Sequence, residues 1–229
     1  MAVITISREF ASLGEETAHT LAELTGYEVA DKALIESKLK ELGLETQKFQ
    51  RFDERNPGFW ASLSQQRDEY LHYLTEVVYA LATQNKCIIV GRGANAILRG
   101  VVHVVSIRLI GTKSTRVERV RKLQNLDARH AMQIIESSDH ERGGFYKYFF
   151  GVNWSDPAEY DLTINTDRCD PMHAAASIKA FCEAIVTPEK EAAGVAKAAD
   201  LLLGAQIVTE ISYHKKIPVH FLEAVVEHG

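Results

Sequence analysis

Apolar and polar positions divide the first 185 residues into short hydrophobic runs separated by amphipathic segments. The runs are rich in β-branched residues and are bounded by turn-forming residues, as expected of buried strands. In the intervening segments, apolar residues recur at helical spacing. The predicted strands are residues 3–6, 27–30, 87–90, 101–109 and 160–165, and the predicted helices are a segment ending at 25, then 31–42, 59–84, a short one through 98, 113–123, one from 127 through 135, and 171–185.

Several predicted helices begin and end at typical boundary residues. Asp31 and Asp127 precede helical segments as N-caps, and Gly43 ends the second helix. Residues 45–58 are polar and contain an Asn-Pro-Gly sequence, which predicts a loop or insert. Strands that alternate with helices in this way indicate an α/β fold with a doubly wound, five-stranded parallel sheet.

Ligands of such a sheet bind at the carboxyl ends of its strands. Ser7, Asp31, Gly91 and Gly111 each follow or end a predicted strand. Because the strands are parallel, these positions are expected to share one edge of the sheet. This edge is the predicted functional site.

Length and composition set the domain organisation. The chain has 229 residues, 46% of them hydrophobic and 25% charged, which is enough for one α/β domain with a small appendage. We expect a main domain over residues 1–186 and a C-terminal extension over 187–229. The extension combines a predicted helix, 189–211, with a predicted strand, 217–226, and cannot form a core alone. It is an ordinary terminal helix, a dimerisation arm for a homo-oligomer, or the start of a further small module truncated at Gly229.

Charge and cysteine usage exclude several classes of function. A net charge of −5 and a pI near 6.0 give no global attraction to nucleic acid or to an anionic membrane, so an anion site must be local. Residues 108–122 supply such a locality, with six basic residues against one acidic residue. The three cysteines lack CxxC spacing and the nine histidines lack metal-ligand spacing. With no signal-like segment and no apolar run of eighteen, the sequence predicts a cytoplasmic protein without a metal centre or membrane span.

The loop after the first strand has the position of a phosphate-binding loop. Such a loop uses glycines to bring backbone N–H groups to phosphate, a Lys for the β- and γ-phosphates, and a Ser or Thr for Mg²⁺. Here Arg8 and Leu13 replace the two glycines, Gly14 the lysine and Glu15 the hydroxyl residue. The nucleotide-binding candidates are Arg8, Phe10, Ala11, Ser12, Leu13, Gly14, Glu15 and Glu16.

A second interpretation of this loop involves no ligand. Ser12 followed by Glu15 is the pattern of a capping box, and Glu15 and Glu16 suit the positive end of the helix dipole. The chain's own carboxylates would then fill the cradle. A carboxylate ~4 Å from a phosphate charge costs about 4 kcal/mol at an effective dielectric of 20. On this interpretation, Arg8 and Glu9 form a structural ion pair beside the loop.

Arginines elsewhere are candidates for phosphate binding. Arg92 stands between two glycines directly after the third strand, and its guanidinium fork suits bidentate phosphate contacts. Arg116 and Arg119 are neighbours on the basic helix and either face a ligand or form a solvent-facing row of weak ion pairs. Asp31 either contacts a ligand at this edge of the sheet or only caps its helix.

Three stretches of the chain resemble the cytidylate kinase-like family, a branch of the nucleoside monophosphate kinases in the P-loop fold. They are ITISREF, IIVGRGANAIL, and SSDHERGGFYKYFFGVNW with YDLTINT, in the family's order and spacing over about residues 3–185. The resemblance implies a sheet of order 2-3-1-4-5, an ATP site at the first loop, a monophosphate-binding segment after the second strand, and a mobile lid.

The resemblance also implies roles for individual residues. Arg92 matches the arginine that contacts the acceptor phosphate in an Asp-Gly-Arg-Asp motif, although Val90 and Gly93 replace both acids. Ala11, Leu13 and Glu15 depart from the family's Gly, Gly and Arg. Matched by position are Arg92, Arg116, Arg119 and Arg142 as catalytic arginines, Asp31, Gly91, Arg92 and Gly93 as acceptor-binding residues, and Asp139 with Arg142 in the lid-like segment.

The sequence thus supports three functional hypotheses. The first is phosphoryl transfer from ATP to CMP or a related nucleoside monophosphate, with Mg²⁺ and weakened by the altered loop. The second is a non-catalytic nucleotide or anion sensor that keeps the fold and has lost the donor site. The third is a structural adaptor that acts through its C-terminal extension. Nucleotides are the expected ligands, and neither nucleic acid nor a membrane is an expected partner.

Overall fold

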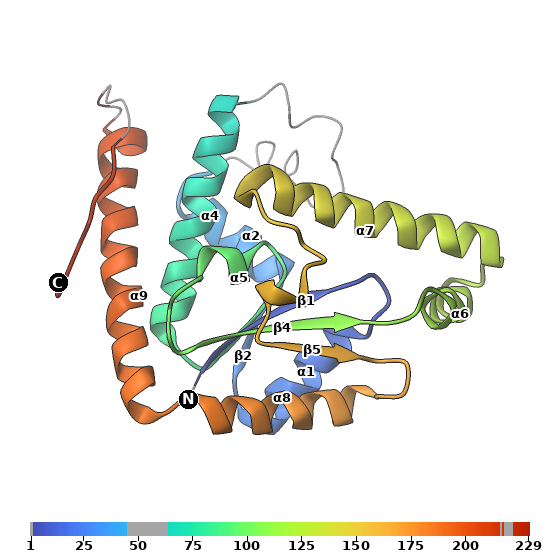
Figure 1. Cartoon of the computed structure of the whole chain (residues 1–229). Coiled ribbons are helices and arrows are strands. Elements are labelled where there is room, and N and C mark those ends of the chain that lie inside the picture. Colours follow the sequence, from blue (N-terminus) through green and yellow to red (C-terminus); the bar gives the residue numbers. More distant parts are fainter. Residues whose placement is uncertain (1, 45–63, 216, 218–221) are drawn as a thin grey trace.

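The computed structural model describes residues 2–44, 64–215, 217 and 222–229. A five-stranded parallel sheet forms its centre, with the strand order β2-β3-β1-β4-β5 (Figure 1). The predicted sheet and its order are confirmed. The strands are β1 Val3–Arg8, β2 Glu28–Ala30, β3 Cys87–Val90, β4 Val104–Ile110 and β5 Leu162–Asn165.

Helices cover both faces of the sheet and surround the carboxyl ends of its strands (Figure 1). α6 follows β4, and α7 runs back from α6 toward α4. The helices are α1 Gly14–Thr25, α2 Lys32–Glu41, α4 Ser64–Gln84, α5 Ala94–Ile97, α6 Lys113–Gln124, α7 Ala128–Phe150, α8 Pro171–Ile185 and α9 Pro188–Thr209, with a 3₁₀ turn η2 Pro157–Glu159 and a π-helical turn η3 Glu210–His214.

The alternation of side chains along the strands separates two apolar layers. Ile4 and Ile6 of β1 pack with Leu21 of α1 and Ile178 of α8 on one face. Val3 faces the other layer, where α2, α4, the end of α7 and α9 meet. Because β1 is buried on both faces, its sequence is a continuous apolar run rather than an alternating one. A smaller apolar cluster joins α6 and α7 to the loop after β1.

Two predicted features differ from the structure. The helix predicted from 127 through 135 is longer in the structure, because α7 continues through Gly143 and Gly144 to Phe150. Residues 217–226 were predicted as a strand, but those among them that the structure describes, 217 and 222–226, form no strand. The C-terminal segment lies against α9, where the Asp200 carboxylate accepts the N–H groups of His228 and Gly229, so no neighbouring strand satisfies its backbone. The predicted insert, 45–58, and the start of the predicted helix 59–84 lie outside the described residues.

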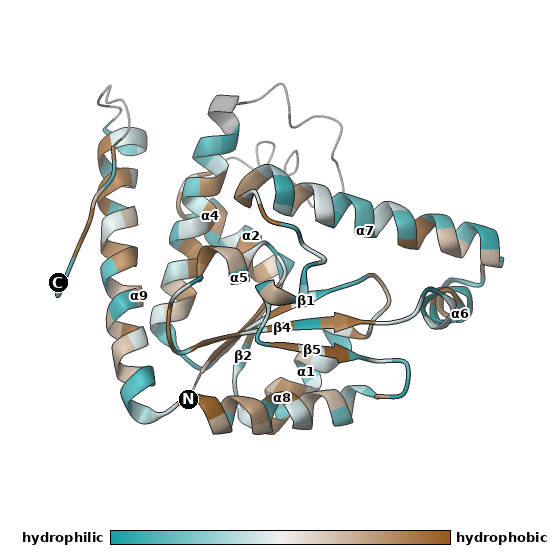
Figure 2. Cartoon of the chain, in the orientation of Figure 1, coloured by the Kyte–Doolittle hydropathy of each residue, from teal (hydrophilic) through white to brown (hydrophobic). Residues whose placement is uncertain are grey.

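α9 lies along α4 and extends the apolar layer on that face (Figure 1). Figure 2 shows apolar residues spread along α9. By length and composition alone, the segment Pro188–His214 is long and apolar enough to cross a membrane, and 28% of its most apolar window is buried inside the molecule. The helix of the extension, α9, therefore packs on the main domain.

Candidate functional site

The loop between β1 and α1 has the backbone of a phosphate cradle although it lacks the glycines. Ala11 and Leu13 have φ angles of 60° and 62°, in the left-handed region that glycine favours. The left-handed conformation raises the conformational free energy of a non-glycine residue by roughly 1–2 kcal/mol. Leu13 is the N-cap residue of α1, and its side chain makes no capping hydrogen bond. The loop therefore keeps a strained conformation that exposes the helix start, where backbone N–H groups lack intrahelical partners.

The predicted capping box is wrong. The Ser12 hydroxyl donates to the carbonyl oxygens of Glu9, at 2.9 Å, and Leu109 of β4, at 3.0 Å. Ser12 is 1% exposed and ties the loop to the sheet. The partner in β4 is 97 residues away in sequence, so local pattern could not identify it.

Arg8 and Glu15 form an ion pair across the mouth of the loop. Arg8 Nε and Nη2 donate to Glu15 Oε1 at 3.1 and 2.8 Å. The Arg8 side chain crosses Gly14 so closely that a Cβ atom there would lie 2.4 Å from Arg8 Cγ. The predicted Arg8–Glu9 pair is therefore wrong. Arg8 brings a cation to the position where a phosphate-binding loop has its lysine, and Glu15 neutralises it.

The pKa of Glu15 records this pairing. Burial raises the pKa of Glu15. The charge and hydrogen bonds of Arg8, together with the backbone N–H of Glu15 itself, lower this pKa by more than burial raises it, so the net shift is downward. Glu15 is thus ionised near neutral pH. Its negative charge therefore lies beside Arg8.

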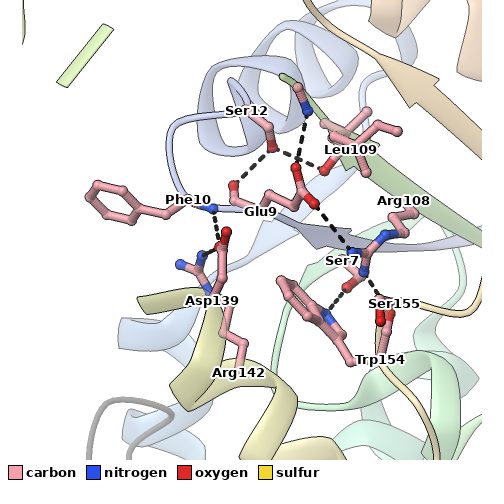
Figure 3. A network of polar contacts seen from close by, with 12 residues as sticks. Ser7, Glu9, Phe10, Ser12, Arg108, Leu109, Asp139, Arg142, Trp154 and Ser155 are labelled. Carbon is pink, nitrogen blue, oxygen red and sulfur yellow. Dashed lines mark hydrogen bonds and ion pairs between the residues drawn. The ribbon is translucent and has the colours of Figure 1, made fainter. Parts of the chain in front are cut away.

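Glu9 lies among cationic and N–H groups from β4 and α6 (Figure 3). Its Oε2 accepts the backbone N–H of Gly111 at 3.1 Å and lies 3.4 Å from Arg116 Nε. Its Oε1 lies 3.6 Å from Arg108 Nη2. A carboxylate of the chain thus occupies a position built to hold an anion.

Arg108 is held rigidly behind Glu9 (Figure 3). Its Nη1 donates to the Trp154 carbonyl at 2.6 Å, and its guanidinium lies 4.2 Å from the centroid of the Trp154 ring. The Trp154 indole N–H donates to Ser7 Oγ at 2.7 Å, and the Tyr160 hydroxyl donates to the Trp154 carbonyl at 2.8 Å. Burial raises the pKa of Tyr160, which keeps this hydroxyl protonated. Ser7 at the end of β1 therefore fixes the indole that stacks on Arg108.

α7 is latched to the loop by Asp139. The Asp139 carboxylate accepts the backbone N–H of Phe10 at 2.9 Å and Arg116 Nη1 at 2.6 Å (Figure 3). Arg142, one helical turn later, lies 5.8 Å from the centroid of the Phe10 ring and 3.9 Å from Asp139. The structure thus brings Asp139, Arg142 and Arg116 together at the loop.

Arg116 and Arg119 both point to the loop rather than to solvent. Arg116 is 3% exposed and also donates to the carbonyl oxygens of Gly111 and Phe10. Arg119 Nη1 donates to the Ala11 carbonyl at 3.1 Å and to Thr166 Oγ1 at 3.0 Å. The alternative of a solvent-facing row is therefore wrong. Their role in phosphate binding stays a prediction.

The acceptor candidates lie at the ends of β2 and β3. Arg92 is 3% exposed, has a φ of 56°, and donates to Glu36 of α2 at 2.8 Å and to the Tyr70 hydroxyl at 3.4 Å. Gly91 and Gly93, on either side, also have left-handed backbone. Asp31 accepts the backbone N–H of Leu34, so its capping role is confirmed. Arg92 thus contacts the segment after β2 by its hydrogen bond to Glu36 and not by a contact with Asp31.

Two cavities meet at Glu9. A cavity of about 280 Å³ lies beside the loop and is lined by Phe10, Ala11, Glu15, Arg119 and Arg142, among others. A cavity of about 620 Å³ lies beneath α7 and is lined by Arg108, Asp139, Lys147 and Trp154, among others. Glu9 lines both. This geometry places one carboxylate between two volumes of ligand size.

The arrangement is chemically suited to holding anions. In the described residues no group of three or more His, Cys, Asp or Glu side chains could hold a metal ion. Arginines from the end of β1 and from β4, α6 and α7 point toward the site. Each of them contacts a carboxylate or a carbonyl of the chain. Positioned guanidinium groups of this kind neutralise phosphoryl oxygens during transfer.

Sequence reasoning missed part of this site. Glu9, Arg108, Trp154, Tyr160 and Glu36 were not among the candidates. Two sequence patterns could have pointed to Arg108 and Trp154: the basic stretch that begins at Arg108 and the VNW sequence. Their convergence depends on the Ser7–Arg108 register of β1 and β4, which no local pattern reveals.

Comparison with known proteins identifies the family. A model described as the cytidylate kinase-like family matches residues 3–168. A cytidylate kinase of Thermoplasma acidophilum is 28% identical over 182 residues, covering 76% of this chain and 89% of that protein. A cytidylate kinase of Pyrococcus horikoshii is 25% identical over 179 residues, covering 78% and 86%.

A solved structure extends the likeness to the fold. An uncharacterized protein from Eubacterium ventriosum superposes with a TM-score of 0.64 at 22% identity, covering 80% of this chain and 99% of that chain. The matched residues contain the loop, the Gly-Arg-Gly turn, α6 and α7. Together with the family match, these features make the function nucleotide kinase-like, and the chain belongs to the cytidylate kinase-like family.

Proposed function

We propose that the chain transfers the γ-phosphoryl group of ATP to CMP or a related nucleoside monophosphate, at a low rate. The observation that carries the proposal is the strained loop backbone at Ala11 and Leu13, which leads into a helix whose N-cap residue, Leu13, makes no side-chain capping hydrogen bond. Such a helix start attracts phosphate. Strain at a loop of this kind is retained when a function requires it.

The donor nucleotide is proposed to occupy the 280 Å³ cavity beside the loop. Phe10 supplies an apolar wall, and Arg119 and Arg142 supply cations from α6 and α7. Phosphoryl transfer depends mostly on positioning and on neutralising the phosphoryl oxygens. Arginines that come from separate elements are suited to both tasks.

The acceptor is proposed to approach Arg92, where three consecutive left-handed residues turn the chain after β3. Glu36 accepts a hydrogen bond from this guanidinium at 2.8 Å. A monophosphate carries more negative charge than a carboxylate and offers more acceptor oxygens. It would replace Glu36 on Arg92.

Mg²⁺, when bound with ATP, would neutralise charge on the β- and γ-phosphates. Glu16 at the loop mouth offers carboxylate oxygens, the kind of ligand that Mg²⁺ prefers. The chain itself contributes binding, orientation and exclusion of water by α7. The Arg8–Glu15 pair has to open first, which supports a low rate.

A second candidate function is nucleotide sensing without turnover. It is favoured by the absence of a side chain at Gly14, the lysine position, where Arg8 lies across the backbone instead. A cation paired with Glu15 binds a phosphate less strongly than an unpaired lysine. A sensor would bind nucleotides through the same arginines and release them unchanged.

Turnover and binding measured side by side separate these functions. We would follow ADP formation from ATP with CMP, UMP, AMP and GMP as acceptors, and measure the binding of each nucleotide by calorimetry. Turnover with a pyrimidine monophosphate supports the proposal, and binding without turnover supports the sensor. An Arg92→Ala variant should lose turnover, whereas Arg99→Ala, at an exposed arginine paired with Glu159, should not. Neither binding nor turnover would contradict both functions.

A further inference from the structure

We propose that the 620 Å³ cavity beneath α7 contains a phosphate subsite, in which Arg108 is the buried cation and the Glu9 carboxylate lies at the place that the phosphate would take. The inference rests on the proposed function in taking the phosphate to belong to a nucleotide. It assigns a role to two residues that the motifs leave without one.

Arg108 is oriented before any ligand arrives. Its side chain is 4% exposed, with the Trp154 ring 4.2 Å and the Tyr160 ring 5.4 Å from the guanidinium carbon. Nη1 is engaged by the Trp154 carbonyl and the Tyr160 hydroxyl, so Nη2 is the nitrogen that faces Glu9. A guanidinium fixed in this way loses little conformational entropy when it binds an anion.

Glu9 satisfies Arg108 only loosely. The 3.6 Å between Arg108 Nη2 and Glu9 Oε1 exceeds the distance of about 2.7–2.9 Å typical of a charge-assisted hydrogen bond. A buried cation with a distant counter-ion is unfavourable. An anion with more oxygens, placed closer, would satisfy it better.

The contacts of Glu9 are those that a phosphate oxygen would make. The backbone N–H of Gly111 donates at 3.1 Å, Arg116 Nε approaches from α6, and Arg108 Nη2 approaches from β4. One carboxylate therefore meets three donors that come from separate elements. The Glu9 side chain is 20% exposed, so it can rotate into solvent when a ligand arrives.

The cavity itself suits a phosphate-bearing ligand. Lys147 and His140 of α7 line it as further basic groups, and Gly143 and Gly144 contribute no side-chain bulk to its wall. The other lining carboxylate, Asp139, is engaged by Arg116 and the Phe10 N–H. Glu9 is therefore the carboxylate that controls access to Arg108.

Trp154 provides a direct readout, because its ring stacks on the proposed cation. The other tryptophan of the sequence, Trp60, is removed by Trp60→Phe, and the fluorescence of Trp154 is then titrated with CMP, cytidine and ADP. A saturable change with CMP but not with cytidine supports the subsite. A lower half-saturating concentration for CMP than for ADP assigns it to the acceptor, and the reverse order to the donor. The same response to cytidine as to CMP, or no response to either nucleotide, overturns it.

Variants test the two residues separately. Glu9→Gln removes the competing charge and should lower the half-saturating concentration about tenfold, which corresponds to about 1.4 kcal/mol. Glu23→Gln makes the same charge change at an exposed position of α1 and should have no effect. Arg108→Gln should weaken binding at least about tenfold in calorimetry, with Arg108→Lys intermediate. Unchanged affinity in Glu9→Gln overturns the proposal even where Arg108→Gln fails to fold.

The readouts keep this inference separate from the proposed function. If nucleotide affinity changes in the Glu9 and Arg108 variants but no turnover is detected, the subsite is supported and the proposed kinase activity is excluded. If turnover is detected and is unchanged in both variants, the kinase activity is supported and the proposed subsite is excluded.

Discussion

The arginines of the site differ in how easily a phosphate could displace their partners. Glu15, the partner of Arg8, has a side chain that is 60% exposed, and exposed ion pairs contribute only about 0–1 kcal/mol. Asp139, the partner of Arg116, is 20% exposed and also holds a backbone N–H. The Arg8–Glu15 pair should therefore open readily, whereas the Arg116–Asp139 pair holds structure.

Removing the charge of Glu15 should strengthen ATP binding. Glu15→Gln releases Arg8 and abolishes the repulsion between carboxylate and phosphate, so the dissociation constant for ATP should fall about fivefold, as roughly 1 kcal/mol predicts. Glu15→Arg should lower it further. Calorimetry with Glu23→Gln as the matched control measures this. A flat or weakened affinity would show that Glu15 does not compete with phosphate.

Arg92 should act on the acceptor rather than on the donor. Its contacts with Glu36 and Tyr70 lie on the side of β2 and α4, away from the loop cavity. Arg92→Ala should therefore raise the dissociation constant for CMP at least about tenfold and leave that for ATP within about twofold. Arg92→Lys, which keeps the charge, should recover part of the CMP affinity. Equal losses for both nucleotides would remove this assignment.

Element boundaries were predictable wherever a local signal sets them. Asp31, Asp127 and Asp170 cap their helices through side-chain acceptors, and α8 and β3 have the predicted bounds. The start of α1 was not predictable, because Ser12 bonds to β4 instead of to its own helix. Gly143 and Gly144 did not end α7, because Phe145 and Phe149 beyond them are buried in the core and hold the helix. Tertiary contacts override propensity in both cases.

The latch between α7 and the loop should contribute measurably to stability. Asp139→Asn weakens the hydrogen bonds to Phe10 N–H and Arg116 and should lower the free energy of unfolding by roughly 1–3 kcal/mol. Glu136→Gln on the same helix breaks only the exposed pair with Lys113 and should cost less than about 0.5 kcal/mol. Urea denaturation followed by circular dichroism compares the two. Equal effects would mean that Asp139 is not a latch.

For the whole molecule, the docking of the extension is the feature that the sequence left open. The family match ends at residue 168, and an Ala-rich helix packs equally well on its own domain or on another subunit. The structure shows α9 against α4, with Thr209 donating to the buried Glu76 and the His72 ring 2.7 Å from the same hydroxyl. Thr209 is 133 residues from Glu76 and 137 from His72 in sequence, so periodicity alone could not predict this polar contact.

Close packing at the start of α9 should make the extension necessary for stability. A Cβ atom on Gly194 would lie 2.1 Å from Nδ1 of the buried His103. Gly194→Val should therefore destabilise the chain by about 1–3 kcal/mol through overpacking. Ala193→Val, at the neighbouring exposed position, should be nearly neutral. Matching melting temperatures for the two variants would contradict the docking of α9 on the domain.

The central claim is that carboxylates of the chain occupy the places of phosphate groups in a working nucleotide site. Its most direct test is the rate of phosphoryl transfer from ATP to CMP in the natural chain and in the Glu9→Gln/Glu15→Gln double variant. The account predicts slow transfer in the natural chain and a rate at least about tenfold higher in the variant, where Arg8 and Arg108 face the ligand without competition. A variant that folds, binds both nucleotides no better and transfers no faster would contradict it.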